Sequence, residues 1–166
     1  MSHDTIDRKV GVVSREMLFS EEGLSFVRGM MDGRHPHSPY AATMGFEIVE
    51  VEAGRVVFIG KPSPQFLNPI GVIHGGWTAT LLDSAMAHAT QTTLKTGEGH
   101  TTVEMKICFV RPVMPSTGLV RCEAKLVHRG SRISMTEARL TDEVGKLLAH
   151  GSETCIIFAS DAAAVR

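Results

Sequence analysis

The sequence is poor in aromatic residues, and neither sign of charge is in excess. Aromatic side chains make up 5% of the 166 residues, and 17 basic residues stand against 18 acidic ones. A net charge of −1 provides no broad basic surface of the kind that nucleic acids and anionic membranes attract. We therefore expect neither as a partner, although this balance leaves room for a small basic patch that holds a phosphorylated ligand.

Cysteine is also scarce, and long apolar runs are missing. The three cysteines, Cys108, Cys122 and Cys155, show no CxxC or other metal-ligand spacing, so we expect no metal site. Each lies in an apolar run, which predicts a small buried side chain. No run approaches the roughly 20 apolar residues that span a bilayer, and residues 1–16 lack the apolar stretch of a signal peptide. We expect a cytoplasmic protein with reduced thiols.

The sequence has enough apolar residues, 43% of the total, to build one sizeable core. Residues 1–44 have an irregular pattern that allows one or two short amphipathic helices, and residues 32–39 break any helix with glycine and prolines. From residue 45 to residue 160 the pattern becomes regular. We therefore expect an N-terminal helical or irregular extension over 1–44 and a main domain over 45–160.

The first regular elements of the main domain are a strand pair and a long helix. Residues 46–52 and 55–60 are typical of strands, with a turn at Ala53-Gly54 between them. Residues 76–94 contain no proline and are rich in alanine, leucine and methionine, which predicts a helix. Apolar residues occur nearly all round this helix, and such a helix is normally buried.

After Gly99 the apolar period changes from helical to alternating. Strands are predicted over residues 103–109, 120–126, 133–140 and 146–158, and the short turns between them predict an antiparallel four-strand meander. Alternation indicates one buried and one wetter face. The predicted fold class is therefore α+β, with one long central helix wrapped by a curved antiparallel β-sheet.

The segment with chemical potential runs from Asn68 to the helix start at His74-Gly75-Gly76. Two glycines let a ligand approach the backbone, and the first N–H groups of a helix lack intrahelical partners and carry the positive end of its dipole. Such a position suits a developing oxyanion. Asp83 lies on the same helix without a basic neighbour, so it has either a chemical role or the structural one of binding a buried group or facing solvent.

The spacing between these groups predicts a two-subunit site. Eight residues separate Gly75 from Asp83, which is about 12 Å along a helix. A single carbonyl group cannot easily contact both. If both act on one substrate, they come from different subunits, and the active site lies at the interface of a two-fold dimer.

The string NPIGVIHGGWTATLLDSA, together with TTVEMKICFVRP, resembles the signature of the phenylacetate-pathway type of thioesterases in the hotdog superfamily. The resemblance covers residues from about 39 to 158. It implies a hotdog fold and hydrolysis of a small, medium-chain or aryl-acyl-CoA to the free acid and CoA. It implies no cofactor, because CoA is part of the substrate, and a homodimer that pairs into a tetramer.

The resemblance also assigns roles. Asp83 matches the catalytic carboxylate, which acts as general base on water or as nucleophile. Gly75 matches the residue whose N–H polarises the thioester carbonyl, and Asn68 matches a side chain that orients the thioester. His74 matches a histidine that positions other groups.

Two further assignments are less direct. Thr102 matches a hydroxyl that holds the attacking water, although strand alternation would place Thr101 on the helix-facing side. For the CoA phosphates we expect Arg111, Arg129 and Arg132, which lie at strand ends or in turns. Solvated turn arginines are the structural alternative for each of them.

Two other functions remain open. A hotdog hydratase or dehydratase would act on an enoyl-CoA without releasing CoA, but the longer histidine segment of such enzymes is missing. A non-catalytic acyl-CoA-binding module is the other alternative, although such modules usually lose the acid that this chain keeps.

Overall fold

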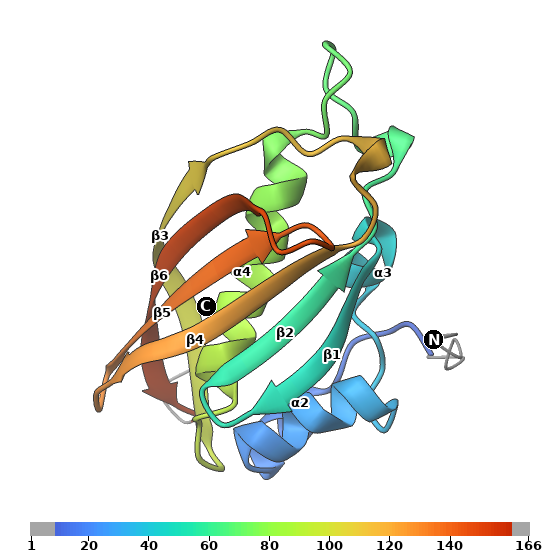
Figure 1. The fold of residues 1–166 in the computed structure, drawn as a ribbon. Coiled ribbons are helices and arrows are strands. Elements are labelled where there is room, and N and C mark those ends of the chain that lie inside the picture. Colours follow the sequence, from blue (N-terminus) through green and yellow to red (C-terminus); the bar gives the residue numbers. More distant parts are fainter. Residues whose placement is uncertain (1–8, 161–166) are drawn as a thin grey trace.

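The computed structural model describes residues 9–160, which form a curved sheet around one helix. The helix is α4 (Gly75–Gln91), and the six antiparallel strands are β1 (Phe46–Glu52), β2 (Arg55–Gly60), β3 (Glu98–Phe109), β4 (Val120–Arg129), β5 (Ile133–Thr141) and β6 (Leu147–Ala159) (Figure 1). The expected α+β fold is confirmed. The expectation of no signal peptide concerns residues 1–16, of which 1–8 lie outside the described part.

The strand order is β1-β2-β4-β5-β6-β3, which corrects the predicted meander. We expected β3 to pair with β4, its neighbour in sequence, but β3 pairs with β6 at one edge of the sheet. The connection from β3 to β4 is long enough to cross the end of the sheet and contains a short 3₁₀ helix, η2 (Pro115–Thr117). Its first residues, Val110 and Arg111, donate backbone hydrogen bonds to the Leu148 carbonyl, which ties the connection to β6.

The core lies between the concave face of the sheet and α4. Inward-facing side chains alternate along β4 and β5, as the sequence pattern predicts. Trp77 and Leu81 of α4 are buried against the sheet, and the Trp77 Nε1–H donates to the Met44 carbonyl at 3.0 Å. The opposite side of α4 is only half-buried. That side includes Asp83 and the small residues around it.

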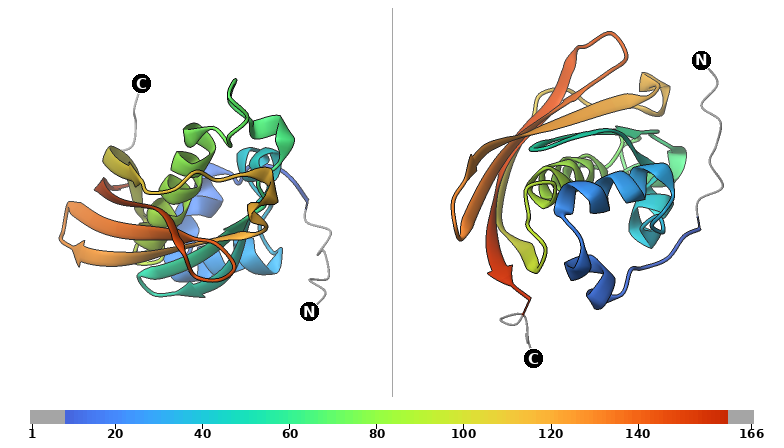
Figure 2. Two further views of the ribbon diagram at one scale, coloured as in Figure 1. Left: turned by 45° about the horizontal axis from the view of Figure 1, so that its top comes forward. Right: turned by 90° about the horizontal axis from the view of Figure 1, so that it is seen from below.

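Three short helices precede the sheet, where we expected one or two: α1 (Arg15–Ser20), α2 (Gly23–Asp32) and α3 (Pro39–Met44). Phe26 and Val27 of α2 belong to the same hydrophobic core as α4, and α2 lies beside α4 on the concave side of the sheet (Figure 2). Within residues 9–160, no helix combines the length and apolar character that crossing a membrane requires.

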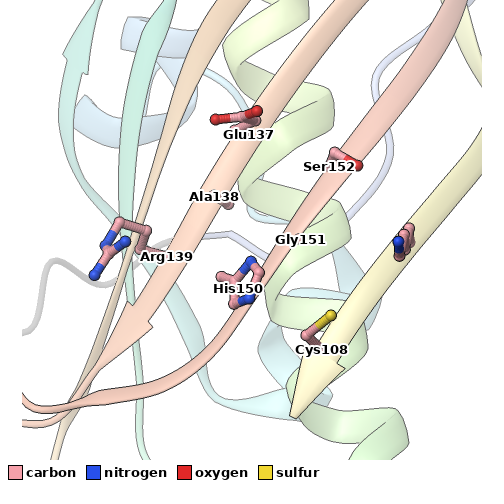
Figure 3. A pocket seen from close by; sticks show the side chains of 8 residues that line it. Cys108, Glu137, Ala138, Arg139, His150, Gly151 and Ser152 are labelled. Atoms are coloured by element: carbon pink, nitrogen blue, oxygen red, sulfur yellow. The ribbon is translucent and has the colours of Figure 1, made fainter. Parts of the chain in front are cut away.

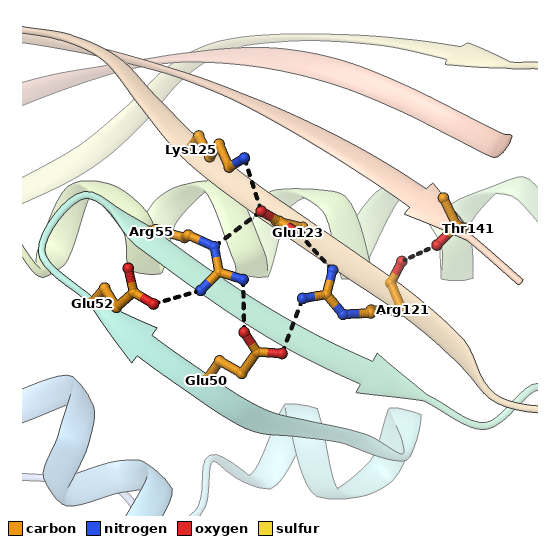
Figure 4. Close-up of polar contacts among 7 residues, drawn as sticks. All are labelled: Glu50, Glu52, Arg55, Arg121, Glu123, Lys125 and Thr141. Atoms are coloured by element: carbon orange, nitrogen blue, oxygen red, sulfur yellow. Dashed lines mark hydrogen bonds and ion pairs between the residues drawn. The ribbon is translucent and has the colours of Figure 1, made fainter. Parts of the chain in front are cut away.

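The outer face of the sheet carries a network of ion pairs (Figure 4). Glu123 on β4 accepts from Arg55 at 2.9 Å and from Arg121 at 2.6 Å, and Glu50 on β1 pairs with both arginines. The network joins β1, β2 and β4 on the side away from α4. It therefore stabilises the sheet and takes no part in the helix-facing chemistry described next.

Candidate active site

The first turn of α4 leaves one backbone N–H available. His74 is the N-cap, and its Nδ1 accepts the Gly76 N–H at 2.9 Å. The Trp77 N–H donates to the His74 carbonyl. Among residues 9–160, no hydrogen bond engages the Gly75 N–H. The histidine thus organises the helix start, and Gly75 keeps the donor that points away from the helix at its positive end.

A hollow of about 300 Å³ opens beside this donor. It is lined by Asn68, Gly75, Thr78, Phe109, Arg111 and residues of the adjoining loops. A Cβ at Gly75 would lie 3.3 Å from the Phe109 ring, so glycine leaves just enough room here for the ring. The structure therefore brings together three of the predicted site residues, Asn68, Gly75 and Arg111.

Asn68 also shapes the loop that precedes the helix. Its Oδ1 accepts the N–H groups of Ile70 and Val72, both at 3.1 Å, which is an Asx-type turn. In the described part of the chain no hydrogen bond uses its Nδ2. The amide oxygen is thus fixed by the loop, and the amide N–H₂ is the end that a ligand can use.

Asp83 lies two turns further along α4, on the half-buried side. No lysine or arginine pairs with it among the described residues. The groups that interact with it are His88, one turn further along the helix, and a second carboxyl group, Glu153 of β6. Asp83 therefore has polar neighbours but no cationic partner among the described residues.

Thr102 is the hydroxyl that faces this region, and a β-bulge explains why. The pairing of β3 with β6 shifts register between Thr102 and Glu104. The extra residue reverses the alternation, so Thr102 points to the inner side with Cys155, its partner on β6, while Thr101 is exposed. The Thr102 Oγ1 donates to Glu153 Oε1 at 3.1 Å.

Glu153 is the residue that sequence reasoning missed. It is 1% exposed, and its Oε1 also accepts from the Cys155 thiol at 3.0 Å. Burial, with a smaller contribution from the charge of Asp83, raises the pKa of Glu153 to about 7. A signal was present in the sequence, because a glutamate occupies the same alternation phase as the buried residues Gly151, Cys155 and Ile157.

Two half-buried histidines, His88 and His100, lie near this carboxyl pair. His88 donates through Nδ1 to the Ser84 carbonyl at 2.7 Å and meets the Phe58 ring edge-on. Burial lowers the pKa of His88, and burial lowers the pKa of His100 to about 4. Both imidazoles are therefore neutral near pH 7, and the His88 ring is held by the Ser84 carbonyl and the Phe58 ring.

The three arginines expected at the CoA phosphates are not brought together within one subunit. Arg111 follows β3, where its Nη1 donates to the Leu147 carbonyl at 2.5 Å. Arg129 and Arg132 lie at the β4–β5 turn, and Arg129 pairs with Glu98 at the other end of β3. The two groups are separated by the length of β3, about 35 Å at 3.3 Å per residue. Arg129 is held by its ion pair, whereas Arg132 is exposed.

A separate hollow of about 300 Å³ lies on the outer face of the sheet (Figure 3). Its lining comes from β3, β5 and β6 and includes Cys108, Arg139 and His150. It contains none of the predicted site residues. Cys108 is exposed here, so the expectation that all three cysteines are buried is wrong for this one, because its side chain lies on the outer face of the sheet. Across residues 9–160 no three potential ligand side chains gather around a metal position.

Comparison with known sequences shows that the chain is similar to thioesterases. Residues 70–149 match the family model described as the thioesterase superfamily. Human acyl-coenzyme A thioesterase 13 is 32% identical over 108 residues, which are 64% of this chain and 76% of that protein. The 1,4-dihydroxy-2-naphthoyl-CoA hydrolase of Listeria monocytogenes is 29% identical over 106 residues, which are 64% of this chain and 85% of the hydrolase.

Solved structures agree in fold. A phenylacetic acid degradation-related protein of Ralstonia eutropha has a TM-score of 0.71 at 31% identity, covering 78% of this chain and 97% of that one. The PaaI protein of the Escherichia coli phenylacetic acid degradation operon has a TM-score of 0.71 at 20% identity, covering 85% and 96%. The second likeness concerns the fold alone.

Proposed function

Because the chain belongs to the hotdog-fold thioesterase superfamily and is a thioester hydrolase, we propose that it cleaves a small, medium-chain or aryl-acyl-CoA into the free acid and CoA. The observation that carries this proposal is a pair of groups on α4. Gly75 offers an unused N–H at the helix start, and Asp83 offers a carboxylate without a cationic partner among the described residues. No cofactor is required beyond the CoA of the substrate.

In the proposed reaction, Gly75 stabilises the oxyanion. The thioester carbonyl lies in the hollow beside Asn68, where the amide N–H₂ orients it and the Gly75 N–H donates to its oxygen. As the tetrahedral intermediate forms, negative charge collects on that oxygen. A backbone donor of this kind contributes about 3–4 kcal/mol to the stability of the transition state, and the helix dipole has the right sign to add to it.

Asp83 promotes attack on the thioester carbonyl carbon by one of two routes. As general base it takes a proton from water while the water oxygen bonds to the carbonyl carbon, and the proton then passes to the departing CoA sulfur. As nucleophile its own oxygen bonds to the carbonyl carbon, CoA leaves, and water hydrolyses the resulting acyl anhydride. Thr102, which faces the same region, positions the water in either route.

The proposal includes a homodimer with two sites, each built from both subunits. Along α4, Gly75 and Asp83 are about 12 Å apart, so one thioester contacts Gly75 of one subunit and Asp83 of the other. The free edge strand β3 supports this arrangement, because its exposed apolar side chains are suited to burial against a second copy: Val103, Met105 and Phe109.

An antiparallel pairing of two β3 strands also brings distant arginines together. Arg111 of one subunit then lies toward the end of the sheet where Arg129 and Arg132 of the other subunit lie. Cations from both subunits thus become available to the CoA phosphates. We extend the proposal to a dimer of such dimers and to a cytoplasmic location.

The test of the proposed function is the Asp83→Asn variant, measured by free-thiol release from short, long and aromatic acyl-CoAs. The exposed Cys108 is titrated beforehand, because its thiol also reacts with the detection reagent. Loss of the carboxylate lowers kcat by about 10²–10⁴-fold, while the unfolding temperature stays close to that of the wild type. The matched control is Ser84→Ala, the adjacent half-buried residue, which keeps normal turnover.

Three outcomes contradict the proposal. Turnover of Asp83→Asn within about tenfold of the wild type removes the assigned role of the carboxylate. Hydration of an enoyl-CoA without thiol release identifies a hydratase. Tight acyl-CoA binding by the wild type without any turnover across the panel identifies a binding module.

A further inference from the structure

Glu153 is a fully buried acid whose hydrogen bonds account for only one of its two oxygens. Oε1 accepts the Thr102 hydroxyl at 3.1 Å and the Cys155 thiol at 3.0 Å. Oε2 is buried and accepts no hydrogen bond from any donor in the described part of the chain. An ionised carboxylate in such a position would leave one charged oxygen without a donor, which is strongly unfavourable.

The neighbour of this carboxyl is the proposed catalytic acid. Asp83 raises the pKa of Glu153 both through its charge and through a side-chain hydrogen bond, in addition to the larger effect of burial. Two neighbouring carboxyl groups in a buried site do not both ionise readily, because like charges repel strongly there. One proton is therefore held by the pair, and the full burial of Glu153 with its unpartnered Oε2 favours Glu153 as the neutral member.

The directions of the hydrogen bonds lead to the same assignment. Thr102 and Cys155 both donate to Oε1, so this oxygen acts as an acceptor. A proton on Oε2 can then be donated to the Asp83 carboxylate. With this single proton, each member of the chain from Thr102 through Glu153 to Asp83 has a donor matched to an acceptor. Without it, both carboxyl groups carry a negative charge in the same region.

We propose that Glu153 is a positioning residue that shares one proton with Asp83, and that this shared proton holds the Asp83 carboxylate and the Thr102 hydroxyl in the arrangement that attack on the thioester requires. The inference rests on the proposed thioesterase function. Glu153 does not contact the substrate in this account. It acts through Asp83 and Thr102.

The other groups that face Glu153 do not titrate near neutral pH. On β6, burial and the Glu153 carboxyl raise the pKa of Cys155 to about 12, so the thiol stays protonated. His88 on α4 and His100 on β3 are neutral, because burial lowers the pKa of both. From β5 the residue opposite Glu153 is Thr136, which carries no charge. Loss of the shared proton is thus the ionisation expected around pH 7.

The experiment compares pH profiles of kcat and KM for the wild type, Glu153→Gln and Glu153→Ala. In the wild type, kcat falls about tenfold per pH unit above pH 7, because ionised Glu153 repels the Asp83 carboxylate. In Glu153→Gln the amide donates to Asp83 at every pH, so this fall disappears. In Glu153→Ala, kcat drops at least about tenfold at all pH values while KM stays within about twofold.

The matched control is Glu104→Gln. Glu104 is exposed on the neighbouring strand β3 and accepts from Thr154 on the outer side. Its substitution leaves the pH profile unchanged. If kcat falls equally above pH 7 in the wild type and in Glu153→Gln, the inference is overturned. A purely structural role of Glu153 would not make the fall in kcat depend on its proton.

A second readout does not depend on turnover. Because the pKa of Glu153 is raised in the folded state, its contribution to stability is complete below about pH 4.5 and is lost as the pH rises through about 7. Between pH 5 and pH 8 the wild type therefore loses on the order of 5–10 °C in unfolding temperature relative to Glu153→Gln. An equal pH dependence of the two proteins contradicts the shared proton.

These readouts separate the two proposals. If no acyl-CoA is hydrolysed but the difference in unfolding temperature is present, the proposed function fails and the proton pair stands. If Asp83-dependent turnover is present but both pH differences are absent, the inference fails and the function stands. If Glu153→Gln does not fold, carbon NMR of labelled glutamate in the wild type replaces it. A carboxyl that titrates near pH 7 supports the inference, and midpoints that all lie below pH 5 overturn it.

Discussion

The assignment of Gly75 as the oxyanion donor can be tested by removing a single N–H group. Gly75 is the first helical residue, the position at which α-helices tolerate proline best. The preceding residue, His74, has φ −57° and ψ 135°, which is the conformation that a residue before proline favours. Because the Gly75 N–H has no partner among the described residues, Gly75→Pro removes the donor and breaks no hydrogen bond of the fold.

The matched control is Gly75→Ala, which adds the same Cβ but keeps the N–H. That Cβ would lie 3.3 Å from the Phe109 ring, so the ring must shift by a few tenths of an ångström in both variants alike. Both variants should therefore unfold within a few degrees of the wild type.

The size of the effect follows from the loss of one oxyanion donor, about 3–4 kcal/mol in the transition state. Gly75→Pro should thus lower kcat for acyl-CoA hydrolysis by about 10²–10³-fold relative to Gly75→Ala. Steady-state kinetics with the acyl-CoA that the wild type hydrolyses fastest measure this ratio. A ratio below about threefold, with both variants folded, would refute the role of the Gly75 N–H.

Two further predictions concern stability. Hydrogen bonds from Arg55 and Arg121 lower the pKa of Glu123 to about 2, so the stability that Glu123 contributes is present above about pH 4.5 and is lost as the pH falls through 2 (Figure 4). Glu123→Gln should therefore lower the free energy of unfolding by about 1–2 kcal/mol at pH 7, with a smaller difference in urea titrations at pH 3; a difference that does not change with pH would contradict this. His74→Ala should lower it by about 1 kcal/mol through loss of the cap on the Gly76 N–H, and His74→Asn should restore it; equal losses in both variants would argue against capping.

The sequence predicted the features of the fold that depend on local patterns. The helix start at His74, the turn at Gly54 and the alternation along β4 and β5 depend on residues close to one another in the chain. The position of β3 was wrong, because pairing with β6 depends on how a long connection crosses the sheet. Period and turn residues carry no information about that crossing.

The same limit applied within the site. Alternation alone places Thr101 on the inner side, and only the bulge after Thr102 reverses the phase of the strand. Glu153 occupies an inward-facing position of β6, but the groups around it come from β3, β6 and α4. A pattern shows that such a residue is unusual, whereas the structure shows that its carboxyl is buried and accepts from Thr102 and Cys155.

The central claim is that Gly75 of one subunit and Asp83 of the other act on the same thioester. Gly75→Pro and Asp83→Asn subunits, coexpressed with different tags, allow the mixed dimer to be purified. One of its two sites then contains both intact groups and the other contains neither, so the mixed dimer should have about half of the wild-type turnover although each parent is nearly inactive. A mixed dimer no more active than its parents, or the failure of the two subunits to copurify, would contradict the account.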